Sequence, residues 1–164
     1  MRRIAIYEID GDRRASTLAL TLLRVGVGAL LIAHGFQKLM DIPHHTAAFA
    51  ALGVPHAQLA VYLAILGEFF GGIGLALGAL TPLAAFGAVL AMGSAIYFAH
   101  RSNGLFAANG GFEYPLTLLL VALYFVAHGA GPLSLDALVS AARHRGFRER
   151  RHADESQPRL HGTL

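Results

Sequence analysis

Four long apolar stretches dominate this sequence and constrain its fold more than any other feature. They cover residues 17–36, 57–80 and 82–99, and a fourth begins near residue 112 or 114 and ends around residues 128–133. A helix needs about 20 apolar residues to cross a bilayer, and in lipid its backbone groups must all be bonded internally. The pattern predicts an all-α membrane protein with four transmembrane helices. A soluble helical protein with buried hairpins is disfavoured, because only 14% of the residues are charged.

The placement of the basic residues predicts how these helices are oriented. Of 13 Lys and Arg residues, four precede residue 15 and six follow residue 142. Basic flanks are retained in the cytoplasm, so we expect both termini on that side and an even number of spans. Short connections, such as the turn at Thr81-Pro82, favour an antiparallel four-transmembrane-helix bundle. We interpret the terminal arginines as topology signals and lipid-headgroup contacts, not as a nucleic-acid surface.

Composition divides the chain into three regions. We expect residues 1–15 to form a cytoplasmic arm and residues 16–140 to form the four-helix transmembrane domain. Residues 141–164 are polar and basic, which predicts a disordered cytoplasmic tail after a short surface helix over residues 135–142. Residues 41–56 are expected to be the first outer loop.

Glycines recur along one face of the second apolar stretch. Gly67, Gly71, Gly74 and Gly78 are spaced by four, three and four residues, which places them on one side of a helix. Small residues at this spacing let another backbone approach closely. We interpret the stripe as packing inside the bundle, with homo-oligomer formation as the less favoured use.

Two charged residues lie at membrane depth, where an unpaired charge costs several kcal/mol. Arg24 lies about two helical turns inside the first span, and Glu68 lies near the middle of the second. Because the two spans are antiparallel neighbours, we predict an Arg24–Glu68 ion pair. Such a pair could relay protons or charge, or it could only fix the register of the two helices.

Further polar residues converge at the outer ends of the spans. Topology brings three segments to this level, and they carry His34, Lys38, His100, Asn109 and Glu113. Such a cluster could hold a small anion or a quinone head group, or it could pass protons to Glu68. The alternative is that the basic residues reach lipid head groups and that His100 and Glu113 cap helix ends.

Cysteine and histidine content limits the cofactors. The chain has no cysteine, which excludes a disulfide, a CxxC redox pair, thiolate zinc, an iron–sulfur cluster and c-type haem attachment. His44, His45 and His56 lack carboxylates or cysteines at ligand spacing, so no metal site is predicted. A b-type haem between His34 and His100 is possible in geometry but disfavoured.

Several segments together resemble the DoxX family of small bacterial membrane proteins, which is related to the DoxD subunit of thiosulfate:quinone oxidoreductases. The matching segments are, in order, LLRVGVGALLIAHGFQK, FAALGVP, GEFFGGIGLALGALTPLAA, NGGFEYPL and GPLSLDALV. Each segment is modest alone, but their order and spacing are specific. The resemblance covers about residues 18–139.

The resemblance implies a multi-pass protein of the bacterial inner membrane that serves as an accessory subunit of a quinone-linked redox system. A quinone is the implied small-molecule ligand, and a redox protein is the implied partner besides the bilayer. Family-typical polar residues map onto Arg24, His34, Lys38, Glu68, His100, Asn109 and Glu113. The alternative is a non-enzymatic scaffold or assembly factor that uses the glycine face and the basic tail. A small-solute transporter ranks third, because no inverted repeat is evident.

Overall fold

A computed structural model of the protein describes residues 10–156, and every regular element in that range is a helix. The elements are α1 (Asp10–Met40), α2 (Ile42–Ala51), α3 (Ala57–Ile65), η1 (Leu66–Phe70), α4 (Gly71–Leu77), α5 (Thr81–Ala95), η2 (Ile96–His100), η3 (Arg101–Asn103), η4 (Ala107–Asn109), α6 (Glu113–His128) and α7 (Leu135–Ser156). Helices η1 and η2 are π-helical. α3, η1 and α4 follow one another without a break, as do α5 and η2, so each set forms one long helix.

Three helical segments are long and apolar enough to cross a membrane. They are Arg14–Met40, Ala57–Leu77 and Thr81–Asn103. A fourth apolar helix, α6, has 16 residues, and at 1.5 Å per residue it spans about 24 Å of a hydrocarbon core that is about 30 Å thick. The backbone stops α6 at Gly129, which has a φ of 71°. The described residues thus contain all four predicted apolar helices, with the fourth shorter than the others.

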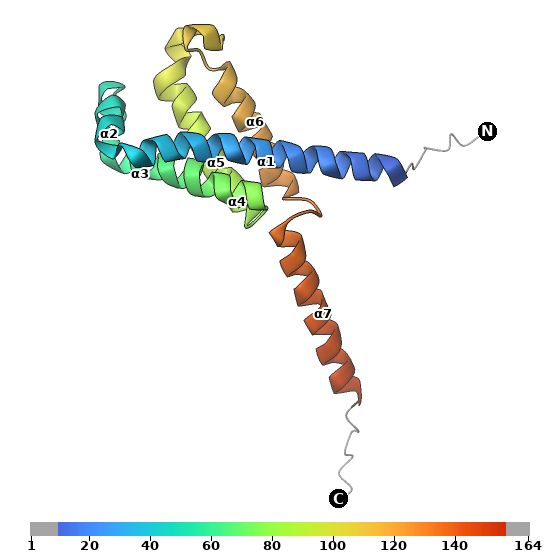
Figure 1. Cartoon of the computed structure of the whole chain (residues 1–164). Helices are drawn as coiled ribbons and strands as arrows, with labels where there is room; N and C mark the ends of the chain where they lie inside the picture. The colour runs from blue at the N-terminus through green and yellow to red at the C-terminus, as the bar shows by residue number, and fades with distance from the viewer. Residues whose placement is uncertain (1–9, 157–164) are drawn as a thin grey trace, which may run out of the picture.

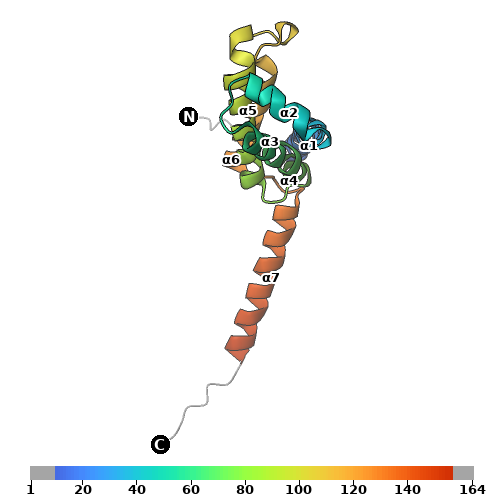
Figure 2. The ribbon, with the colours of Figure 1, turned by 90° about the vertical axis from the view of Figure 1, so that its left-hand side faces the viewer.

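The four apolar helices form two hairpins that cross. In one hairpin α1 packs along α4 and η1, and in the other α5 packs along α6. Figures 1 and 2 show the α5–α6 hairpin passing α1, α3 and α4 at a steep angle instead of running parallel to them. The buried core lies where the hairpins cross, and it draws on α1, α4, α5 and α6 through Val27, Leu31, Leu75, Ala85, Ala88, Ala91, Met92, Leu118, Ala122 and Phe125.

The glycine stripe makes this crossing possible. A Cβ atom added at Gly67 would lie 2.6 Å from the carbonyl oxygen of Gly87, and one at Gly71 would lie 3.0 Å from that of Ala84. Both contacts are with the backbone of α5, so a side chain here would force the helices apart. The interpretation of the stripe as internal packing is confirmed. The same face is therefore occupied within the chain.

The segment after the first span is more ordered than expected. Residues 41–56 were predicted to be a loop, but Ile42–Ala51 form helix α2. The side chain of Asp41 accepts a hydrogen bond from the backbone N–H of His44 at 3.1 Å, and Pro43 lies in the first turn. An acidic N-cap and an early proline are both helix-start signals. The loop prediction is wrong for this part because these signals, followed by a run of alanines, start a helix directly after the first span.

Helix α7 is also longer than expected. The predicted surface helix ended at Ala142, whereas α7 continues from Leu135 to Ser156. Residues 143–156 include five arginines, two glutamates and an alanine, which have high helix propensity. Helix α7 therefore covers residues 141–156 of the segment that was predicted to be disordered. Residues 157–164 lie outside the described part of the chain.

Candidate functional site

Glu68 is buried in η1, and its ion-pair partner is Lys38. The ammonium of Lys38 on α1 contacts Oε2 of Glu68, and the two side chains are 15% and 5% exposed. The predicted Arg24–Glu68 pair is therefore wrong. In an α-helix the Cα–Cβ bonds tilt toward the N-terminus. The Lys38 side chain thus reaches down from the outer end of α1 toward Glu68, whereas that of Arg24 points away toward the inner end.

Arg24 is 2% exposed and fixes the inner end of the bundle. Its guanidinium donates to the carbonyl oxygen of Leu75 at 3.0 Å and to that of Leu133 at 2.7 Å. Leu75 lies in the last turn of α4, and Leu133 lies in the link between α6 and α7. Carbonyls at the end of a helix have no partner within the helix, so they are natural acceptors for a buried arginine. Arg24 therefore joins three segments and has a structural role.

Both π-helical segments carry a predicted site residue. Glu68 lies in the middle of η1, and His100 is the last residue of η2. A π-turn inserts one extra residue into a helix, and such turns are frequent at functional sites because they redirect a side chain. No pattern in the sequence predicted either segment. Their positions favour a role for Glu68 and His100 beyond packing.

The outer loop is held by the remaining polar residues. His100 donates through Nδ1 to the carbonyl oxygen of Gly110 at 2.7 Å, and the Glu113 carboxylate accepts from the N–H of Ala107 at 2.6 Å. Asn109 lies exposed at the end of η4. These contacts fold the loop between η2 and α6 back onto the start of α6.

His34 has a partner that the sequence did not suggest. Its Nε2 lies 3.2 Å from the hydroxyl of Tyr114, and the two rings are 5.7 Å apart between centroids. Tyr114 is the second residue of α6, beside Glu113, so it arrives at the same level as the outer end of α1. A tyrosine at a helix start in an apolar sequence was the available signal. Tyrosine is also common at membrane interfaces, so its position alone does not indicate this contact.

A long apolar groove separates the two hairpins on one side. Its volume is about 990 Å³, near the upper end of typical ligand pockets. Its walls come from α3, η1 and α4 on one side and from α5 and η2 on the other, with Leu66, Phe70, Phe86 and Leu90 among them. Of the seven predicted site residues, Lys38, Glu68 and His100 line the groove. Arg24, His34, Asn109 and Glu113 are not part of its lining within the described chain.

Groups of three or more His, Cys, Asp or Glu that could hold a metal are absent from the part of the chain that the structure describes. The rings of His44 and His45 contact each other edge to face, with centroids 5.4 Å apart. The groove itself is lined by the Lys38 ammonium, the Glu68 carboxylate and the His100 imidazole, and most of its other lining residues are apolar.

Asp136 is a structural residue that the sequence analysis did not single out. Its carboxylate accepts from the backbone N–H groups of Leu80 at 2.8 Å and Thr81 at 2.9 Å, and its own N–H donates to Gly78 at 2.8 Å. These bonds cap the start of α5, where Leu80 adopts a left-handed φ of 47°. A leucine has no side chain that could cap the helix, so Asp136 supplies the carboxylate from the first turn of α7.

The comparisons with known proteins follow the same part of the chain. The protein-family model described as DoxX matches residues 19–101, which are half of the chain. The chain belongs to the DoxX family. An uncharacterized protein from Haemophilus influenzae is 36% identical to this DoxX protein over 121 residues, which cover 71% of this chain and 87% of the relative. No solved structure matches. Family membership and the apolar helices make this DoxX protein a multi-pass membrane protein.

The Asp136 cap of this DoxX protein predicts a pH dependence of stability. Burial raises the pKa of Asp136, but the N–H groups of Thr81 and Leu80 and the nearby Arg24 outweigh it, so this pKa lies below its ordinary value. A carboxyl with a lowered pKa contributes stability above its unfolded pKa of about 4, and this contribution is lost as the pH falls through the folded pKa.

We therefore expect Asp136→Asn to lower the free energy of unfolding by about 1–2 kcal/mol at pH 7. The difference from the wild type should shrink as the pH is lowered below about 4. Unfolding titrations in mixed detergent micelles between pH 3 and pH 7 measure it. A difference that stays constant over this range would contradict the assignment of the cap to an ionised carboxylate.

Proposed function

We propose that this DoxX protein is an accessory subunit of a quinone-linked redox system in the bacterial inner membrane. In this proposal four helices cross the bilayer, both termini are cytoplasmic, and a quinone binds in the groove between the hairpins. The observation that carries the proposal is the place of Lys38, Glu68 and His100 at one apolar groove. The positive-inside distribution of Lys and Arg supports the orientation.

The groove suits a molecule with a polar head and a long apolar tail. Its apolar walls reach from Leu80 at the inner end of α5 to His100 at the outer end. Twenty residues of helix are about 30 Å long, which is the thickness of the hydrocarbon core. An isoprenoid tail fits such a channel, which is lined by His100 at its outer end and by Glu68 of η1. This pattern of an apolar pocket with few polar groups is typical of sites for amphipathic ligands.

The three polar groups match the two redox states of a quinone head. The Lys38 ammonium can donate a hydrogen bond to a quinone carbonyl, which is an acceptor only. Because Nδ1 of His100 donates to Gly110, Nε2 of a neutral His100 is free to accept from a quinol hydroxyl. Glu68 is paired with Lys38 and can take up or release a proton. Reduction of the quinone to the quinol consumes two electrons, which the redox partner supplies, and two protons.

Binding of a short-chain quinone to the purified protein tests this proposal. We expect Glu68→Gln and His100→Ala to weaken binding by about tenfold each, since each loses a hydrogen bond to the head group. His44→Ala is the matched control, because His44 is exposed on α2 and lies outside the groove. If both groove variants bind the quinone as tightly as the wild type and the control, the proposed site is wrong.

The scaffold alternative is weaker than the sequence suggested. It relied on the glycine face of the second span, but that face packs against α5 in the same chain. Replacing Gly71 or Gly74 by leucine would therefore disrupt the bundle itself, whatever partner it binds. A partner would have to use another surface, such as α7.

A further inference from the structure

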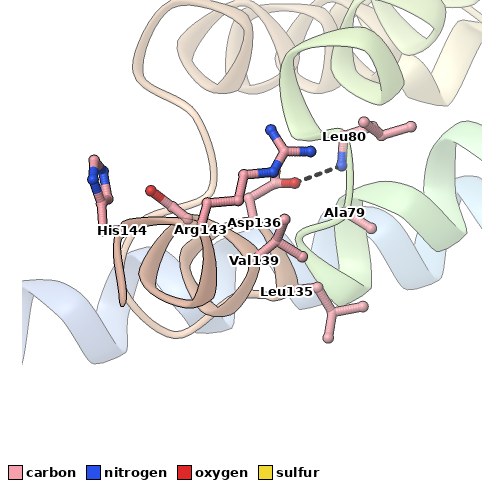
Figure 3. Close-up of a pocket in the computed structure, with 8 residues that line it drawn as sticks. Ala79, Leu80, Leu135, Asp136, Val139, Arg143 and His144 are labelled. Atoms are coloured by element: carbon pink, nitrogen blue, oxygen red, sulfur yellow. Dashed lines mark hydrogen bonds between the residues drawn. The ribbon is translucent and has the colours of Figure 1, made fainter. Parts of the chain in front are cut away.

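A second pocket lies at the opposite end of the groove, beside the turn between α4 and α5. Its volume is about 590 Å³, within the range of ligand pockets, about 300–1,000 Å³. Figure 3 shows its residues, which come from the turn and from the first turns of α7. They are Ala79, Leu80, Leu135, Asp136, Val139, Ser140, Arg143 and His144.

The charge that this pocket offers to a ligand is positive. Asp136 is the acidic residue of the lining, but its two carboxylate oxygens accept from Leu80 and Thr81, and Arg24 lies near enough to balance its charge. Arg143 is exposed and makes no ion pair within the described chain. In Figure 3 it extends from α7 toward the turn at Leu80. An exposed guanidinium at the edge of a pocket with apolar walls is well suited to bind a phosphate.

The pocket is continuous with the apolar groove. Ala79 and Leu80 line both cavities, and Leu77 and Leu83 extend the groove away from the pocket. These leucines are more than half exposed, as expected for side chains that face lipid tails. A ligand with its phosphate near Arg143 would therefore have its apolar part next to Leu80 and the inner end of the groove.

We infer that the α4–α5 turn and α7 form a binding site for one anionic phospholipid of the cytoplasmic leaflet. The inference rests on the proposed orientation, which places this turn at the cytoplasmic surface, and not on the quinone. The phosphate binds Arg143 in a pocket that Ser140 and His144 also line, and an acyl chain enters the inner end of the groove. The cytoplasmic leaflet carries the anionic lipids that attract basic juxtamembrane segments.

Lipid retention by the full chain, measured by native mass spectrometry, tests the site. Protein in mild detergent is incubated with equal amounts of phosphatidylglycerol and phosphatidylcholine. We expect the wild type to retain the anionic lipid with about a tenfold preference, as charge-assisted hydrogen bonds to phosphate would give. The double variant Arg143→Ala/His144→Ala should lose this preference.

Arg145→Ala is the matched control, because it removes the same charge from α7 at an exposed residue outside the pocket lining. It should retain the preference to within about twofold. Equal loss in both variants, or no loss in the double variant, would overturn the site. In a further experiment, excess inorganic phosphate is added to the lipid-bound protein. It should leave the lipid bound, and displacement by phosphate alone would overturn the assignment to a lipid.

This test and the quinone test fail independently. Arg143→Ala/His144→Ala should bind quinone as the wild type does, because neither residue lines the outer end of the groove. Glu68→Gln should retain the anionic lipid. A wild-type protein that shows no preference for the anionic lipid but binds quinone as expected would therefore remove only the present inference, and the reverse result would remove only the proposed function.

Discussion

Replacing Arg24 by methionine should lower the free energy of unfolding by about 4 kcal/mol, because a buried charge with its hydrogen bonds is removed from its partners. The variant leaves the carbonyls of Leu75 and Leu133 without their donor. It also leaves Asp136 without the cation that offsets its charge. The three segments that this side chain joins would separate more easily at this end of the bundle.

Unfolding titrations in mixed detergent micelles measure this loss. Arg14→Met serves as the control, because Arg14 lies on the same helix and is exposed. Its effect should stay within about 0.5 kcal/mol. Hydrogen exchange at the Leu80 and Thr81 amides gives a local measurement, since the cap held by Asp136 should open more often without Arg24. An Arg24→Met protein as stable as the control, with unchanged exchange, would show that Arg24 does not fix the inner end.

The second large effect concerns the Lys38–Glu68 pair. Lys38→Met should cost about 3 kcal/mol of unfolding free energy, because a carboxylate that is 5% exposed loses its counter-charge. The double variant Lys38→Met/Glu68→Met should recover most of this loss. An apolar pair of similar volume replaces a buried ion pair at little cost, whereas breaking one half is expensive.

The same Lys38 and Glu68 variants separate the effect on stability from the effect on ligand binding. The double variant should fold well but fail to bind a short-chain quinone, because both groups proposed to contact the head are gone. A double variant that is no more stable than Lys38→Met alone would contradict the pairing seen here. A double variant that binds quinone normally would contradict the role given to the pair.

The sequence predicted the parts of this fold that depend on composition and period. Apolar stretches of membrane length predicted the helices, and the spacing of Gly67 and Gly71 predicted a close helix contact. Both properties are local, so they can be found without knowing what lies opposite. The family match over residues 19–101 could also be predicted, because the order of the motifs is a property of the sequence alone.

The partners of the buried charges could not be predicted in this way. Depth alone made Arg24 and Glu68 candidates for a pair, but the direction of the side chains along α1 decided against it. The steep crossing of the two hairpins also leaves the groove between them. A bundle of four nearly parallel helices would not have this groove. Asp136 follows a proline and glycine break and contacts a turn 55 residues away, so no local pattern marked it.

The most direct test of the quinone site is to map where a photoreactive quinone analogue labels the protein in native membranes. We expect labelled peptides to contain Lys38, residues 66–70 and residues 96–100, and we expect unlabelled quinone to compete with this labelling. Lys38 and residues of the other two segments line the groove. Labelling confined to α6 or α7, or labelling that unlabelled quinone does not reduce, would contradict the account.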